Sequence, residues 1–135
     1  MTPFQVEKTF DQFLHQQWEF PEITAVRWTG DDAPNLPYIE PHLKFGNTFG
    51  LEINGVAERV GVLFINIFTR SDVNNREGFA YGGRLEKLFW HRRFENGIVC
   101  EDGALMPSTQ KIGLDKARQA LHFQTQIPFS IIMEY

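Results

Sequence analysis

Hydrophobic positions near the N-terminus recur with the spacing of a helix. The stretch TPFQVEKTFDQFLHQQWEF opens with Thr2, a good capping residue, followed by Pro3, which suits the first position of a helix. We therefore expect an amphipathic helix that ends near Pro21. Its apolar stripe consists of Phe4, Val6, Phe10, Phe13, Leu14 and Trp18.

Strand patterns follow this helix. A strand fits ITAVRW, and a second fits YIEPHLKFGNTFGLEI, residues 38–53. Asn54-Gly55 is typical of a two-residue hairpin turn, because few other residue pairs adopt the positive φ angles that such a turn requires. It therefore predicts that residues 38–53 form a hairpin with residues 57–70. Both faces of this next strand are apolar, so we expect it to be central and covered on two sides. One cover is a helix of the same chain, and the other is a second sheet layer or another subunit.

A second helix pattern occupies NREGFAYGGRLEKLFWHRRFENG, which starts at residue 75. Asp72 and the two asparagines that follow it are candidate caps, and Asn96-Gly97 is expected to close the helix. One face carries Tyr81, Leu85, Leu88 and Phe89, with Gly78 and Gly82 on the same face. Glycine lowers helix stability, so its repeated use there predicts a close approach to the sheet.

The C-terminal part ends in a long alternating pattern. Residues 98–119 fit either two short strands or one strand and an extended arm, whereas ALHFQTQIPFSIIMEY predicts a long half-buried strand. Pro128 lies on its polar side and removes one donor, which favours an edge or a non-bonded position. The order of elements predicts a single α+β domain over residues 1–135. We expect a mainly antiparallel sheet, with the N-terminal helix and the second helix packed on one face.

Composition and charge narrow the function classes. The formal charge of −4 argues against wrapping nucleic acid, which requires clustered Lys and Arg. The sequence has neither a leader pattern nor an apolar run long enough to span a membrane, so we expect a soluble protein. Its single cysteine, Cys100, fits a reducing cytoplasm and reads as a buried small hydrophobe. The 13 Phe, 3 Trp and 3 Tyr exceed what one small core readily hides, so some of them are expected to face a partner.

Motifs that carry chemistry are missing from this sequence. None of the four histidines has metal-ligand spacing, and no serine lies in a GxSxG context. The glycines of YGGR, residues 81–84, lack the spacing of a phosphate-binding loop and are expected to serve helix packing. We therefore predict no catalytic, cofactor-binding or metal-binding residues, and no cofactor.

The order and type of several segments resemble the tail terminators of long-tailed bacteriophages, also called tail-completion or minor tail proteins. The similar segments are AVRW, LPYIEPHL, GVLFINIFTR, GGRLEKLFWHRRF and the terminal FQTQIPFSIIMEY. The sequence of Trp28, Pro37 and Tyr38 is particularly similar. The segment from Gly103 to Ala117 departs from the commoner pattern because it is longer and less rich in glycine.

The resemblance implies an α+β fold and a structural role without enzyme activity. It implies a hexameric ring of identical subunits in the virion, at the head-proximal end of the tail, assembled in the cytoplasm of the host bacterium. Its expected partners are other copies of the chain, the tail-tube protein and the head connector, with no membrane; DNA passes through the lumen without specific binding. Candidate contact residues, from their type and place, are Asp31, Asp32, Tyr38, Phe45, Phe49, Arg59, Arg70, Arg76, Arg92 and Arg93. Core packing is an equally good interpretation of the three aromatic residues among them.

Two other interpretations stay open. The chain fits a small α+β enzyme or ligand-binding domain in which Trp28, Phe64, Phe68 and Trp90 line an aromatic pocket. It also fits a monomeric domain with no assignable role. The proline-rich segment 27–47 is interpreted as the lead-in to a strand, with its TGDDAPN portion as an exposed loop.

Overall fold

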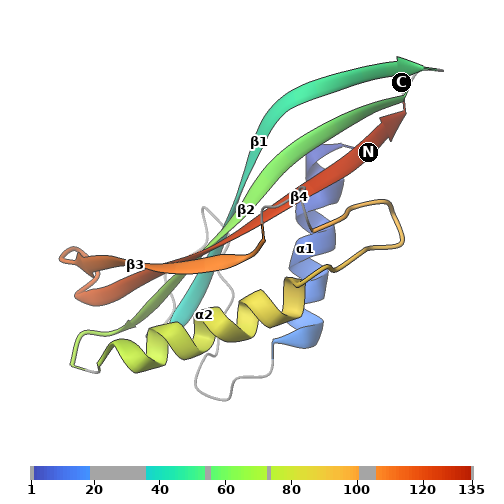
Figure 1. The fold of residues 1–135 in the computed structure, drawn as a ribbon. Helices are drawn as coiled ribbons and strands as arrows, with labels where there is room; N and C mark the ends of the chain where they lie inside the picture. Colours follow the sequence, from blue (N-terminus) through green and yellow to red (C-terminus); the bar gives the residue numbers. More distant parts are fainter. Residues whose placement is uncertain (1, 19–35, 54–55, 73, 101–105, 135) are drawn as a thin grey trace.

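The architecture is a four-stranded antiparallel sheet with two helices (Figure 1). The computed structural model describes residues 2–18, 36–53, 56–72, 74–100 and 106–134, with the backbone alone at 47–53, 56–58 and 132–134. The helices are α1 (Pro3–Gln17) and α2 (Asn75–Phe89), and the strands are β1 (Tyr38–Ile53), β2 (Val56–Arg70), β3 (Ser108–Asp115) and β4 (Ala120–Glu134). The strand order is β1-β2-β4-β3, and every neighbouring pair is antiparallel. The predicted α+β class is therefore confirmed.

The predicted hairpin joins the first two strands of the sheet. β1 and β2 pair from Ile53 opposite Val56 to Tyr38 opposite Phe68, and β2 then pairs with β4 along its whole length. β2 is thus a central strand, as its apolar sequence predicted. The strand expected at ITAVRW and the turn residues Asn54 and Gly55 lie outside the described residues.

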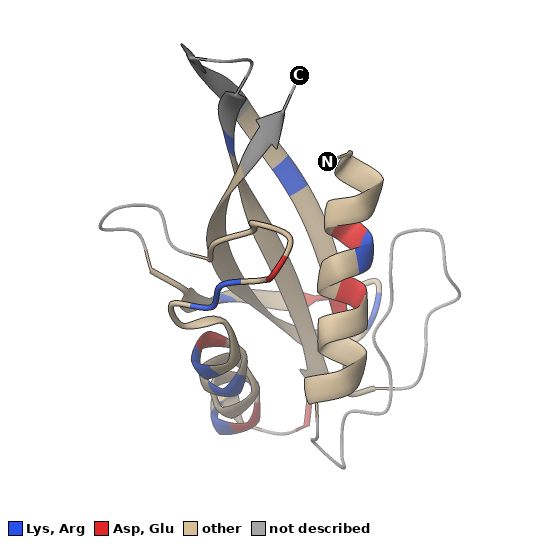
Figure 2. Cartoon of the chain, turned by 90° about the vertical axis from the view of Figure 1, so that its right-hand side faces the viewer, with Lys and Arg blue, Asp and Glu red and all other residues tan. Residues whose placement is uncertain are grey.

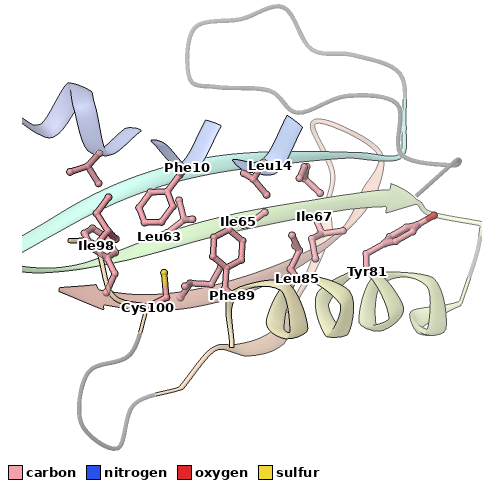
Figure 3. Close-up of a cluster of buried hydrophobic side chains, with 14 of the residues drawn as sticks. Phe10, Leu14, Leu63, Ile65, Ile67, Tyr81, Leu85, Phe89, Ile98 and Cys100 are labelled. Carbon is pink, nitrogen blue, oxygen red and sulfur yellow. The ribbon is translucent and has the colours of Figure 1, made fainter. Parts of the chain in front are cut away.

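Both helices pack on one face of the sheet, which we call the inner face (Figure 3). Leu63, Ile65 and Ile67 of β2 are fully buried there. The ring of Phe10 from α1 lies 6.0 Å from the ring of Phe89 in α2 and 5.2 Å from that of Phe129 in β4. These edge-to-face contacts join both helices and the sheet into one core.

Helix α1 begins as predicted and ends earlier than predicted. Thr2 and Gln5 form a capping box, in which the Gln5 amide donates to Thr2 Oγ1 at 3.3 Å and the Thr2 amide donates to Gln5 Oε1 at 2.8 Å. The helix stops at Gln17, capped by Trp18, and does not reach Pro21. Phe4, the first residue of the predicted apolar stripe, is 72% exposed in the first turn, whereas Val6, Phe10 and Leu14 are fully buried.

Helix α2 also ends before its predicted limit. Asn74 provides the cap, since its side chain accepts a hydrogen bond from the Arg76 amide at 2.9 Å. The helix ends at Phe89 and not at Asn96-Gly97, because His91 adopts a positive φ of 50° that breaks the helical path. Gly97, with φ of 94°, instead supports a tight turn in which the Ile98 carbonyl accepts from the Phe94 amide at 2.8 Å. This turn places Phe94 against Phe10 and Phe13.

Two prolines occur inside strands without loss of a sheet hydrogen bond. Ser130 exchanges both backbone hydrogen bonds with Val99, at 2.9 and 2.8 Å, on the side of β4 away from β2. Alternate residues of an antiparallel strand point the same way, so Pro128 faces that side too, and β3 reaches no further than Gln126. By the same alternation, the nitrogen of Pro41 faces the outer edge of β1. The expected non-bonded position of Pro128 is confirmed.

The predicted close approach of α2 to the sheet is also confirmed. A Cβ built on Gly78 meets Phe123 at 2.1 Å, and one built on Gly82 meets Thr109 at 2.3 Å. These contacts are too short for any side chain, so α2 lies on β3 and β4 at a distance that only glycine permits.

Gly78→Ala is expected to lower the free energy of unfolding by about 1–3 kcal/mol, because the new methyl group forces α2 away from Phe123. Gly83→Ala is the matched control: it lies on the same helix with nothing within 4 Å of its Cβ position, and it should raise stability by about 0.5–1 kcal/mol. Urea unfolding followed by circular dichroism measures both. A stabilising Gly78→Ala would contradict the close approach.

Candidate functional site

A row of polar side chains crosses the sheet on the face opposite the helices, which we call the outer face. His122 Nε2 lies 2.9 Å from Asn66 Oδ1, and the side-chain amide of Gln124 donates to the same oxygen at 3.1 Å. Gln126 Nε2 in turn donates to Gln124 Oε1 at 3.2 Å. The row is half-buried, and its mutual hydrogen bonds hold the side chains in one arrangement.

One end of this row meets a cluster around Arg118, which lies in the turn between β3 and β4. The Arg118 guanidinium donates to the Tyr38 hydroxyl at 3.1 Å and to Asp115 Oδ2 at 2.7 Å. It lies 3.8 Å from Glu40 Oε2 and 4.5 Å from the centre of the Phe68 ring. The Arg118 cluster therefore joins the β3–β4 turn to β1 and β2.

Burial and hydrogen bonding set the charge states within this cluster. The Arg118 backbone amide donates to Asp115 at 3.0 Å, and this bond, followed by the Arg118 guanidinium, holds the pKa of that carboxyl below its ordinary value. The pKa of His122 is lowered chiefly by burial, while Asp115 and Glu40 oppose the shift and Arg118 adds to it. The His122 ring stacks on Phe68 with ring centres 4.6 Å apart. These groups are engaged with one another, so the arrangement mainly supports the fold.

A groove opens further along the outer face. It has a volume of about 330 Å³, and its lining includes Lys44, Val62, Phe64 and Pro128. A smaller hollow of about 120 Å³ adjoins it where Val62 and Pro128 meet Met106. The groove reaches Pro128 of β4, two residues beyond the last pair between β3 and β4, Ser108 and Gln126.

The aromatic residues expected to line a ligand pocket are dispersed in the described part of the chain. Phe64 lines the groove, but Phe68 is buried in the Arg118 cluster. Trp90 caps α2, which packs on the inner face, and its side chain is 53% exposed. Trp28 lies outside the described residues. The sheet therefore separates Trp90 from the other two.

Three of the candidate contact residues, Tyr38, Phe45 and Arg59, pack against the strands of the sheet. Tyr38 is 2% exposed and accepts its hydrogen bond from Arg118. Phe45 is half-buried, with the Arg59 guanidinium 4.4 Å from its ring centre and the Phe129 ring 5.9 Å away. For Tyr38 and Phe45, core packing is the interpretation that fits these contacts.

The remaining candidates are scattered over the fold. Arg92 is exposed, yet its Nε donates to the Leu88 carbonyl at 3.2 Å and its guanidinium lies 5.0 Å from the centre of the Phe13 ring. Arg70, Arg76 and Arg93 have exposed side chains in different elements. Phe49 pairs with Glu58 in the sheet, where only the backbone is described, and Asp31 and Asp32 lie outside the described residues.

The Arg118 cluster was missed by sequence reasoning. Arg118 and Tyr38 are 80 positions apart, and no local pattern links them. The one available signal was the polar turn DKARQ before the last strand, where a long cationic side chain can reach across neighbouring strands.

The described residues offer neither a metal-binding cluster nor a reactive thiol. Those residues contain no group of three or more His, Cys, Asp or Glu side chains placed to hold a metal ion. Cys100 is fully buried, and burial raises the pKa of its thiol to about 12, as expected for a packing residue. In the described segments, neither helix is long and apolar enough to cross a membrane.

Comparison with known proteins gives no identification. The sequence matches no protein-family model, and no curated protein matches it significantly.

Arg118→Met, Tyr38→Phe and the double variant form a cycle that measures the cluster. We expect a coupling free energy of about 1 kcal/mol between Arg118 and Tyr38. This is the usual contribution of one hydrogen bond from a charged donor when water partly screens the charge. Chemical denaturation of the four proteins provides the values. Additive effects would show that the Arg118–Tyr38 contact contributes nothing to folding.

His122 should make stability depend on pH below neutrality. The pKa of His122 in the folded state lies below the ordinary value of 6.5 that it has in the unfolded chain. Neutral His122 therefore stabilises the fold above the unfolded-state pKa, and this stabilisation is lost as the pH falls through the folded-state pKa. His122→Gln should therefore flatten the decline of unfolding free energy between about pH 7.5 and pH 5. His91→Gln, at an exposed position, is the control. Identical slopes for wild type and His122→Gln would contradict the assignment.

Proposed function

We propose that the chain is a structural subunit of a phage tail, a tail terminator. In this role it forms a ring at the head-proximal end, stops polymerisation of the tail tube and joins the tail to the head connector. The observed α+β architecture agrees with what the resemblance in sequence implies.

The length of three strands is the observation that carries the proposal. β1, β2 and β4 have 16, 15 and 15 residues, so each extends about 50 Å, whereas strands in compact domains average about 5–6 residues. In Figure 1, the end of this sheet where β1 ends, β2 begins and β4 ends projects beyond α2. A projecting sheet end suits a subunit that reaches onto its neighbours in a ring.

The outer face and the charge balance offer further support. In the described part of the chain, both helices cover the inner face, while the outer face presents half-buried amides beside an apolar groove. Such a face is suited to lie against another protein surface. A formal charge of −4 suits a ring through which DNA moves without adhering.

Deletion of the gene from the phage genome that carries it tests the proposal. We expect particles with tails of irregular length and heads that stay unjoined, as seen by negative-stain electron microscopy, because nothing then caps the tube. Supplying the wild-type chain from a plasmid should restore normal particles and the plaque titre. Tails of normal length joined to heads without the chain would overturn the proposal.

A further inference from the structure

Exposed apolar side chains gather where β3 forms the edge of the sheet. Among the described residues, Phe79 and Leu114 are 46% and 57% exposed. The Phe79 ring of α2 lies 5.1 Å from the Phe123 ring, and Phe123 pairs with Lys111 of β3. Leu114 pairs with Leu121, two residues before Phe123 on the same face of β4, so the exposed groups belong to one continuous surface.

Basic side chains surround this apolar surface. Lys111 lies within it, Lys116 follows Leu114 in the β3–β4 turn, and both are exposed. Arg76 is exposed one helical turn before Phe79. We call Phe79 and Leu114, together with Arg76, Lys111 and Lys116, the edge patch. Apolar side chains amid like charges are typical of a surface that binds an acidic partner.

Strand addition is a poor way to cover the edge patch. β3 carries Lys111 and a register shift between Lys111 and Gly113, two features that oppose pairing with a further strand. A partner that binds the edge patch must therefore contact its side chains, and not pair with the backbone of β3.

A complementary surface lies on α1. Phe4 is 72% exposed, and Glu7 and Asp11 follow it at three and seven positions, which places the three residues on one side of the helix. Lys8 offsets part of this charge, and Asp11 lies 3.6 Å from His15. We call Phe4, Glu7 and Asp11 the α1 patch. It pairs an exposed aromatic ring with acids, where the edge patch pairs apolar groups with bases.

The two patches lie on different sides of the molecule. In Figure 1, the β3–β4 turn lies at the left and α1 at the right, and Figure 2, viewed from that right-hand side, shows α1 in front with acidic positions along it. We propose that the edge patch of one copy docks on the α1 patch of the next copy. This inference rests on the proposed ring, because contact between two different patches is head-to-tail and repeats around a closed assembly.

Charge balance favours a second copy as the occupant. The chain has 13 Lys and Arg against 17 Asp and Glu, a formal charge of −4. Three of those cations belong to the edge patch, so the remaining surface of each copy carries a more negative net charge than the whole chain. A neighbouring copy therefore attracts the edge patch and presents an apolar group to it at Phe4.

A charge exchange tests the contact in the deletion phage complemented from a plasmid. Lys111→Glu places an acid opposite Glu7 and should lower the plaque titre at least about tenfold, with the tail defects of the deletion. Adding Glu7→Lys restores the opposite pairing and should recover most of the titre. Lys87→Glu on α2 makes the same charge change at an exposed position two helical turns beyond Phe79, and it should leave the titre unchanged.

The outcomes separate the contact from the ring itself. Full complementation by Lys111→Glu, or a defect that Glu7→Lys does not relieve, overturns the docking of these two patches while the deletion phenotype still supports a tail terminator. A deletion without tail defects overturns the tail function first. Thermal unfolding of the purified variants, expected to match wild type because both positions are exposed, excludes loss of folding as the cause.

Discussion

The close approach of α2 to the sheet determines the contacts of this helix with β3 and β4 and the surface beside them. Gly78 rests on Phe123 and Gly82 on Thr109, so the helix backbone lies almost directly on β4 and β3. That distance lets Thr109 bond both Glu86 of the helix, at 3.0 Å, and Thr125 of the sheet, at 2.8 Å. It also leaves the next residue, Phe79, at the margin of the interface, half in contact with Phe123 and half exposed. The apolar surface at the β3 edge is thus a consequence of how α2 packs.

The outer face is stabilised mainly by contacts between its own side chains and not by packing of helices in the described part. Helices supply no cover there in the described part, and the sheet is held by hydrogen bonds between side chains and by the Arg118 cluster. Phe68 is buried on this face because Tyr38, His122 and the Arg118 guanidinium all lie against it. Of the apolar residues of β2 on this face, Phe68 is thus covered by the Arg118 cluster, whereas Val62 and Phe64 line the groove.

Elements with a regular pattern were predictable from the sequence. The limits of β1, the central place of β2, the Asn74 cap and the packing role of Gly78 and Gly82 follow from local periodicity and residue type. The end of α2 did not follow, because hydrophobic periodicity does not show which residue adopts the positive φ that His91 has. The exposure of Phe4 was equally hidden, since periodicity places it on the stripe but cannot show that the sheet gives it no cover. The Arg118 cluster depends on long-range topology, which no local pattern encodes.

The edges of the sheet limit how copies of this chain can associate. Continuous strand pairing between subunits gives open-ended growth unless its geometry closes, and it requires free donors on both edges. Here Pro41 removes a donor from the outer edge of β1, while Lys111 and the irregularity before Gly113 disturb the edge of β3. In the proposed ring, contacts between copies then form through side-chain surfaces, whose shapes fix the angle between neighbours. A ring of defined size requires a fixed angle, so the features that blunt both edges of the described sheet agree with the proposed closed assembly.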